Sequence, residues 1–330
     1  MNKIKIAFIA LYFLPVAGCF KPYQERASVS LIFDTDIGPD YDDVGAITLL
    51  HAFADSNKVK ILATVASSKY QHVAAVINVF NTYFHRPDIP IGVPKGNAVT
   101  DKDFQHWTDT IIARYPHSIK SNEETPDAVT VYRKVLASQP DHTVTIVTVG
   151  FLTNLANLLA SPPDVVSKLT GTDLVKRKVK LLVCMAGRFP QGREYNVHRD
   201  APASKKVFAA WPTDILLSGF EIGQKIKTGL PLIRNESISN SPVKDVFRIS
   251  IPMAAEDKEG RMSWDQTAIF VAVKGVSPYF EIVPGRMVMH EDGSNSWDST
   301  GKNHFYLVQK MPVGEMTNII NELMMHQPKK

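Results

Sequence analysis

Residues 29–54 of this chain read VSLIFDTDIGPDYDDVGAITLLHAFA, and their pattern predicts the fold. Residues 29–33 form a short β-type run that ends on acids, and residues 44–54 carry apolar side chains at helical spacing. A strand, an acidic loop and a helix therefore follow one another directly. In parallel sheets, the chemistry gathers just beyond the carboxyl ends of the strands, where loops meet helix N-termini. The loop at residues 34–43 is thus the first candidate for a functional site.

This loop contains five carboxylates in ten residues, namely Asp34, Asp36, Asp40, Asp42 and Asp43. Capping of the following helix would use one or two of them. Crowded carboxylates repel one another unless they are protonated or bridged by a cation. Oxygen-only ligands favour a hard ion, and flexible carboxylates suit Ca²⁺ better than Mg²⁺. The loop therefore predicts a calcium site, although its Asp spacing does not match that of an EF-hand.

The pattern of strand followed by helix repeats along the chain. Strands are predicted at residues 59–65, 89–93, 143–149, 179–185 and 215–217, and helices at residues 73–84, 129–136, 152–159, 203–210 and 313–325. Such alternation is typical of parallel βαβ units. Residues 279–289 alternate instead like an antiparallel strand. We predict one α/β domain over residues 29–330, with a mainly parallel central sheet flanked by helices in a Rossmann-like core.

Residues 1–18 have the pattern of an export signal. Two lysines precede the apolar run IAFIALYFLPVAG, which is too short to span a bilayer as a permanent helix. The small residues before Cys19 resemble the lipobox of bacterial lipoproteins, in which the cysteine receives a lipid and becomes the mature N-terminus. We predict a lipidated Cys19, a tether over residues 19–28, and an exported protein anchored to a bacterial membrane, facing the periplasm or the outside. A plain secretory signal with an incidental cysteine is the alternative.

The charge balance argues against a dedicated nucleic-acid surface. The chain has 37 Lys and Arg residues against 33 Asp and Glu residues, and its longest basic runs are short. A nucleic-acid surface would need a concentrated basic patch. The second cysteine, Cys184, has no disulfide partner if Cys19 carries lipid. Because it lies in an apolar run, we expect it to be a small buried hydrophobe.

The acidic loop resembles the N-terminal signature D-T-D-x-G-x-D-D of inosine–uridine-preferring nucleoside hydrolases, here with two extra residues before the final pair. Three further segments resemble motifs of this family in the same order. They are residues 148–154 (TVGFLTN), residues 185–200 (MAGRFPQGREYNVHRD) and residues 263–268 (SWDQTA). The resemblance covers nearly the whole chain after the signal and implies a calcium-dependent N-glycosyl hydrolase.

The resemblance also implies roles for single residues. The calcium ligands would be the carboxylates of Asp36, Asp43 and Asp265 and the backbone carbonyl of Val149. Asp36 would also take the proton from a calcium-bound water. The ribose hydroxyls would be bound by Asp42, Glu194 and Asn196, and the insertion leaves open whether Asp40 or Asp42 takes that role. Asp34 would be structural.

The sequence departs from the family pattern near the leaving base. Trp264 stands where purine-using members carry a histidine that protonates the base, and Ser68 stands where many members carry an asparagine that reaches the ribose. We keep both as candidate substrate-binding residues. Leaving-group help could come from another histidine, and the candidates are His106, His198, His290 and His304. Other loop side chains that could reach the substrate are Arg188, Arg193, Trp107 and Trp297.

The favoured function is therefore calcium-dependent hydrolysis of ribonucleosides to ribose and free base, through an oxocarbenium-like ribosyl. The expected partners are a small nucleoside and the membrane, through the lipid. The family resemblance implies a homodimer or homotetramer. Two alternatives remain. One is a lipoprotein that binds nucleosides or ribosides without turnover. The other is a haloacid-dehalogenase-like phosphatase, because Asp34 and Asp36 follow a strand as its D-x-D loop does.

Overall fold

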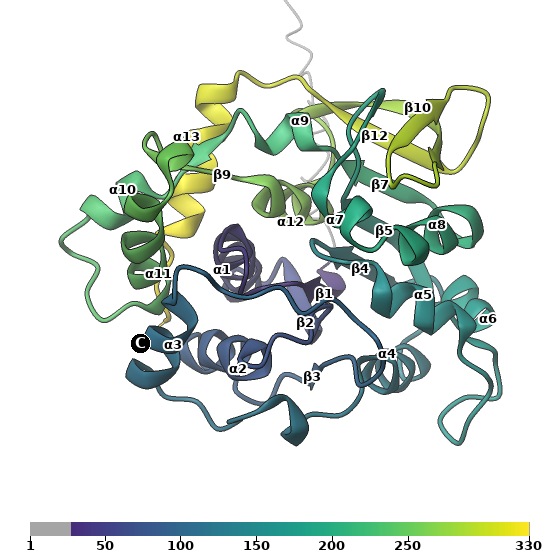
Figure 1. The fold of residues 1–330 in the computed structure, drawn as a ribbon, viewed down its shortest axis with the longest axis horizontal. Coiled ribbons are helices and arrows are strands. Elements are labelled where there is room, and N and C mark those ends of the chain that lie inside the picture. Colours follow the sequence, from purple (N-terminus) through teal and green to yellow (C-terminus); the bar gives the residue numbers. More distant parts are fainter. Residues whose placement is uncertain (1–27, 330) are drawn as a thin grey trace, which may run out of the picture.

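The computed structural model describes residues 28–329. The predicted signal, Cys19 and nearly all of the predicted tether lie outside these residues. Among the described helices, none is both long and apolar enough to cross a membrane. The described chain follows the predicted strand–helix alternation (Figure 1).

The centre of the fold is a ten-stranded sheet in the described residues. In sheet order its strands are β3 (Ile91–Gly92), β2 (Val59–Ala66), β1 (Val29–Thr35), β4 (Val144–Thr148), β5 (Val179–Met185), β7 (Ile215–Ser218), β12 (His304–Gln309), β10 (Phe280–Met289), β11 (Asn295–Asp298) and β6 (Gln191–Gly192). Pairing is parallel from β3 to β12 and antiparallel from there to β6. The predicted parallel sheet and the antiparallel strand near residue 280 are both confirmed.

Helices cover both faces of the sheet (Figure 1). One face packs against α1 (Asp42–Asp55), α2 (Val73–Tyr83), α3 (Trp107–Arg114), α11 (Pro242–Ser250), α12 (Trp264–Lys274) and α13 (Val313–Met324). The other face packs against α4 (Ala128–Ala137), α5 (Thr153–Ala160), α6 (Gly171–Lys178) and α8 (Ala201–Ala210). Successive strand residues point to opposite faces, so Phe33 joins the first core and Ile32 the second.

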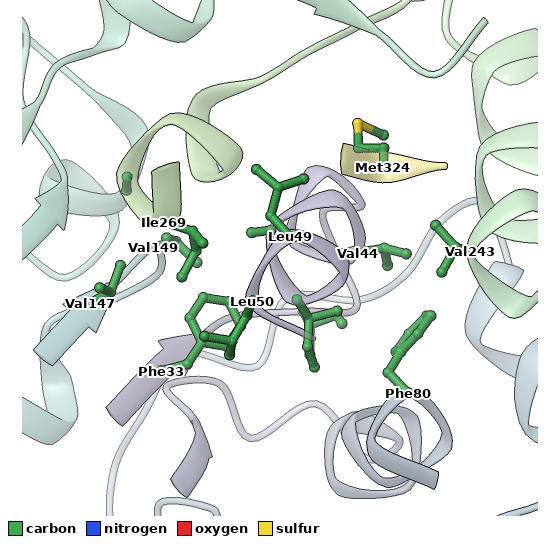
Figure 2. Close-up of a cluster of buried hydrophobic side chains, with 14 of the residues drawn as sticks. Phe33, Val44, Leu49, Leu50, Phe80, Val147, Val149, Val243, Ile269 and Met324 are labelled. Atoms are coloured by element: carbon green, nitrogen blue, oxygen red, sulfur yellow. The ribbon is translucent and has the colours of Figure 1, made fainter. Parts of the chain in front are cut away.

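Helix α1 lies at the middle of the first core, and every residue from Asp42 to Ala54 is buried. A helix that is apolar on all sides fits only such a position. Figure 2 shows Leu49 and Leu50 of α1 between β1, α12 and α13, with Val44 toward α11. Since α1 is enclosed, its first turn cannot shift, and the two acids in that turn are fixed in space.

Short elements complete the carboxyl edge of the sheet. They are α7 (Tyr195–Arg199), α9 (Phe220–Gly223), α10 (Leu230–Arg234), β8 (Lys227–Thr228) and β9 (Arg261–Met262). Strands β8 and β9 pair antiparallel in a separate small sheet. These short elements were not predicted because they are too short for a periodic signal. Helix α12 was not predicted either, because it is buried on nearly all sides and shows no polar face.

Glycine at position 150 permits the close approach of two loops at this edge. A Cβ there would lie 2.6 Å from the backbone nitrogen of Asp36 and 2.5 Å from the hydroxyl of Ser67. The loops after β1 and β4 can therefore meet only because residue 150 has no side chain.

Gly45 plays the same role between α1 and α12, so we predict that Gly45→Ala destabilises the fold. Its Cβ would lie 2.2 Å from Nε2 of the fully buried Gln266, which has no room to move outward. Overpacking of this kind costs about 1–3 kcal/mol in the free energy of unfolding. Urea unfolding measures the loss. Gly96→Ala is the matched control, because a Cβ there meets nothing within 4 Å. Equal stability of the two variants would contradict this view of the α1–α12 contact.

Candidate active site

A cavity of about 400 Å³, including the space at its mouth, lies at the carboxyl edge of the sheet. Its polar wall consists of Asp36, Asp40, Asp42, Asp265, Glu194 and Asn196. Its apolar wall consists of Val149, Met185, Tyr195, Phe220 and Trp264. The four motif segments, far apart in the sequence, therefore meet at one place.

Asp43 lies at the bottom of the acidic cluster and is fully buried. One of its carboxylate oxygens accepts a short hydrogen bond from the hydroxyl of Thr35. The other oxygen, Oδ2, has no hydrogen-bond partner among residues 28–329. Burial and the charge of Asp40 raise the pKa of Asp43 to about 7. An unpartnered buried carboxylate oxygen of this kind is suited to a cation.

Asp36 and Asp265 lie beside Asp43 and are almost fully buried. Burial, then the charges of Asp43 and Asp40, hold the pKa of Asp36 well above its usual range. Burial, then the charges of Asp42 and Asp43, do the same for the pKa of Asp265. The side chains of Asp36, Asp43 and Asp265 therefore share one crowded, desolvated volume.

Asp40 and Asp42 form the other half of the cluster, and both pair with Arg261. The guanidinium Nη2 of Arg261 lies 3.0 Å from Asp42 Oδ1 and makes a shorter contact with Asp40. The backbone N–H of Asp265 donates to the other oxygen of Asp42 at 3.2 Å. Among the described residues, the carboxylates whose oxygens all come within 4.8 Å of one another, close enough to bind one ion, are those of Asp40, Asp42 and Asp43. The guanidinium of Arg261 thus neutralises the carboxylates of Asp40 and Asp42.

Arg261 is held by its surroundings as well as by charge. Its guanidinium lies 4.9 Å from the ring centre of Tyr41 and 5.1 Å from that of Trp264. The hydroxyl of Tyr41 donates to Asp257 at 2.5 Å, and Asp257 also faces Arg261. The sequence reasoning missed Arg261, although it precedes the SWDQTA segment by only two positions.

The ribose-binding candidates Glu194 and Asn196 are fixed by α7. The carboxylate of Glu194 caps this helix, accepting from the backbone N–H groups of Asn196 at 2.9 Å and Val197 at 3.2 Å. Burial raises the pKa of Glu194 to about 7. The side-chain amide of Asn196 donates to the carbonyl of Val149 at 2.8 Å. The predicted carbonyl ligand and the predicted ribose ligand are therefore in direct contact.

The apolar wall is formed mainly by aromatic rings. The indole N–H of Trp264 donates to the carbonyl of Phe220 at 2.8 Å, and the two ring centres lie 5.2 Å apart. The hydroxyl of Tyr195 donates to Asp101 at 2.6 Å, and Asp101 pairs with Arg199. These contacts hold flat aromatic surfaces in the same cavity as the carboxylates, as a site for a sugar with an attached ring requires.

Several residues singled out in the sequence do not line this cavity. Ser68 is buried and binds backbone groups of residues 70 and 99, so its predicted role in substrate binding stays a prediction. Trp107 lies in the core, and Trp297 packs on Phe189 and Tyr306. Cys184 is free and buried, as expected, and Asp34 accepts hydrogen bonds from Tyr132 and Asn154 in the structural role that the family resemblance implied.

Solved structures with the same fold include nucleoside hydrolases. A plant nucleoside hydrolase is 18% identical, with a TM-score of 0.68 over 90% of this chain and 99% of that chain. A purine-preferring ribonucleoside hydrolase from Gardnerella vaginalis is 17% identical, with a TM-score of 0.68 over 90% and 99%. The type III effector protein XopQ, solved in complex with adenosine diphosphate ribose, is 14% identical, with a TM-score of 0.68 over 91% and 94%.

No curated protein sequence matches the chain. At the identities above, the solved structures establish the fold alone. The family assignment comes from the sequence profile of the inosine-uridine preferring nucleoside hydrolases, which matches residues 31–322. This match includes all four motif segments that meet at the cavity. The chain therefore belongs to the inosine-uridine preferring nucleoside hydrolase family, a family of N-glycosyl hydrolases.

Proposed function

We propose that this protein hydrolyses the N-glycosidic bond of ribonucleosides, releasing ribose and a free base, with the help of Ca²⁺. The observation that carries the proposal is the composition of one cavity. Its lining combines carboxylates and an amide suited to a ribose with aromatic rings suited to a base. The family membership supports the same reaction.

The acidic cluster fits a divalent cation. Asp43 Oδ2 is buried without a partner among the described residues, and the pKa values of Asp36 and Asp265 are raised by burial and mutual repulsion. We assign the ligands to Asp36, Asp43, Asp265 and the carbonyl of Val149, since Arg261 already neutralises Asp40 and Asp42. An all-oxygen set with flexible carboxylates favours Ca²⁺, which when bound would lower the pKa of a water ligand and polarise the ribose hydroxyls.

In the proposed reaction, Asp36 accepts the proton of the attacking water. It lies in the cavity wall as part of the acidic cluster, and a carboxylate positioned beside a bound water is a suitable general base. Asp42, Glu194 and Asn196 hold the ribose hydroxyls, which orients C1′ for attack. The remaining carboxylates stabilise the positive charge that develops on the ribosyl in the transition state.

Of the two acids left open by the sequence, we assign the ribose role to Asp42. Its side chain is 2% exposed and is fixed by Arg261 and by the backbone N–H of Asp265. The side chain of Asp40 is 39% exposed and lies nearer the solvent. A rigid acceptor loses less entropy when it binds the sugar, so Asp40 is better explained as a second partner for Arg261.

A second candidate function is binding of a ribosyl compound without turnover. The structure of XopQ with adenosine diphosphate ribose favours it, because that fold accepts a ribose-containing ligand. Ligand binding to the full chain without ribose release, measured with calcium present, would select this function over hydrolysis.

We predict that Asp36→Ala abolishes ribose release. A positioned base contributes about 10²–10⁴-fold to rate, and Asp36 would also lose its role as a ligand, so kcat should fall by at least about 10⁴-fold. A reducing-sugar assay on the full chain with calcium measures this. Asp141→Ala is the control, because Asp141 lies on the surface and pairs with Arg177 and Lys178. Turnover by Asp36→Ala near that of the control would refute the assignment of the site.

We predict that chelation stops turnover and that added Ca²⁺ restores it. Ca²⁺ at about 100 times its Kd should also stabilise the fold by about 2.7 kcal/mol, because it binds only the folded state. Differential scanning calorimetry measures the rise in Tm, and Asp265→Asn should abolish it. Restoration by Mg²⁺ but not by Ca²⁺ would show that the wrong metal has been assigned.

We predict that Arg261→Met weakens both folding and substrate binding. Removing one partner of a buried ion pair costs about 3–5 kcal/mol in the free energy of unfolding. Arg261→Lys keeps the charge but loses the two-pronged geometry, so it should fold and show a raised KM with a smaller change in kcat. Urea unfolding and steady-state kinetics measure these effects. An unchanged KM in both variants would show that Arg261 does not position Asp42.

A further inference from the structure

The wall of the cavity that would face the leaving base offers no good proton donor among the described residues. Its rings are Phe220, Trp264 and Tyr195. The indole of Trp264 is not an acid, and its N–H already donates to the carbonyl of Phe220. The hydroxyl of Tyr195 donates to Asp101, and burial together with that carboxylate holds the pKa of Tyr195 well above its usual range. Tyr195 therefore keeps its proton.

The histidines considered from the sequence are engaged elsewhere. His106 binds Asp109, His198 binds Arg193, His290 binds Ser296, and His304 is buried and binds the backbone of Met287. Within residues 28–329, no histidine lines the cavity. Burial raises the pKa of Glu194 to about 7, but its carboxylate is fixed at α7 by the backbone N–H groups of residues 187, 196 and 197 and is assigned above to the ribose hydroxyls, not to the base.

The same wall is suited to a positive charge. Faces of aromatic rings attract cations, and the structure already has Arg261 over Trp264 and Arg188 over Phe220, at 4.8 Å in the second case. Arg261 faces Asp40, Asp42 and Asp257, and Arg188 is exposed beside Glu221. No lysine or arginine is among the described residues that line the cavity, whereas five of them are acids.

The charge of the base decides whether a proton donor is needed. A neutral base such as hypoxanthine leaves as an anion unless it is protonated, and a positioned acid supplies about 10²–10⁴-fold in rate. A cationic ring behaves differently. Water oxygen bonds to C1′, the C1′–N bond breaks, and its electron pair neutralises the ring nitrogen. The proton of the water passes to a carboxylate, and no proton goes to the leaving group.

We propose that the preferred substrates of this site are N-ribosides with a cationic base, such as pyridinium ribosides. This inference rests on the hydrolysis proposed above and names its substrate class. The aromatic wall binds the charged ring, the acidic wall favours it over neutral rings, and departure of the ring requires no acid. Neutral purine and pyrimidine nucleosides lack this advantage and are poor substrates.

The test compares four ribosides with the full chain and calcium. Nicotinamide riboside is cationic, inosine and uridine are neutral and need an acid, and p-nitrophenyl riboside is neutral but needs none. We expect kcat/KM for nicotinamide riboside to exceed that for inosine and uridine by about 10²-fold or more, with p-nitrophenyl riboside also cleaved. Inosine or uridine cleaved as well as nicotinamide riboside, or p-nitrophenyl riboside cleaved without nicotinamide riboside, would overturn the inference alone. Cleavage of none of the four would overturn the proposed hydrolysis itself.

Recognition of the charge is tested apart from turnover with dihydronicotinamide riboside. This reduced compound has nearly the same shape without the positive charge. We expect its dissociation constant to be at least tenfold above that of nicotinamide riboside, both measured by quenching of tryptophan fluorescence with the Asp36→Ala variant. Equal binding of the two compounds would show that the wall does not recognise charge.

Trp264→His tests the missing acid, with Trp264→Phe as the matched control. Both variants lose the hydrogen bond to the carbonyl of Phe220, but only the histidine can protonate a base. We expect Trp264→His to raise the ratio of kcat/KM for inosine to that for nicotinamide riboside by about tenfold or more, and Trp264→Phe to leave it low. An unchanged ratio in folded Trp264→His would mean that protonation does not limit inosine and would overturn the inference.

Discussion

Mutual repulsion of buried carboxylates is the constraint on which the rest of this site depends. The carboxylates of Asp36, Asp40, Asp42, Asp43 and Asp265 are gathered at one edge of the sheet. Burial raises the pKa of all of them except the more exposed Asp40, whose pKa is lowered by Arg261. Part of this repulsion is neutralised within the fold, because Arg261 pairs with Asp40 and Asp42. The inner acids have no such partner among the described residues, and this asymmetry is what makes the cluster suitable for a metal ion.

The elements that hold the cluster are the most enclosed parts of the fold. Asp42 and Asp43 form the first turn of α1, where the helix dipole favours negative charge. Asp265 lies in the first turn of α12, which packs closely on α1 because Gly45 leaves room for Gln266. The N-termini of α1 and α12 therefore offset part of the electrostatic repulsion between the carboxylates. The same packing keeps the carboxylates from moving apart.

Patterns local in sequence predicted most of the sheet and half of the site. The run at residues 29–54 predicted strand, loop and helix because a cluster of acids separates its two apolar segments. Helix α12 was missed as an element because it is buried on nearly all sides, so its polar and apolar residues do not separate into two faces. Arg261 was missed because its role exists only in three dimensions, as it pairs with Asp42 from 219 positions away. The acidic cluster in the sequence indicates that a positive charge must neutralise it, but the sequence does not indicate that Arg261 provides part of that charge.

The two halves of the cavity are built differently, and this difference bears on specificity. The side that would hold the metal ion is built on β1, α1 and α12, which are buried in the main core, so its geometry is tied to the stability of the whole domain. The base side is formed by Tyr195 of the short α7, Phe220 of the short α9 and the first residue of α12. Substitutions there can change which base is accepted with little effect on the core. This division allows the base that is released to change while the reaction stays the same. Trp264 lies between the two sides of the cavity, because it precedes Asp265 in the sequence and lies in the wall that would contact the base.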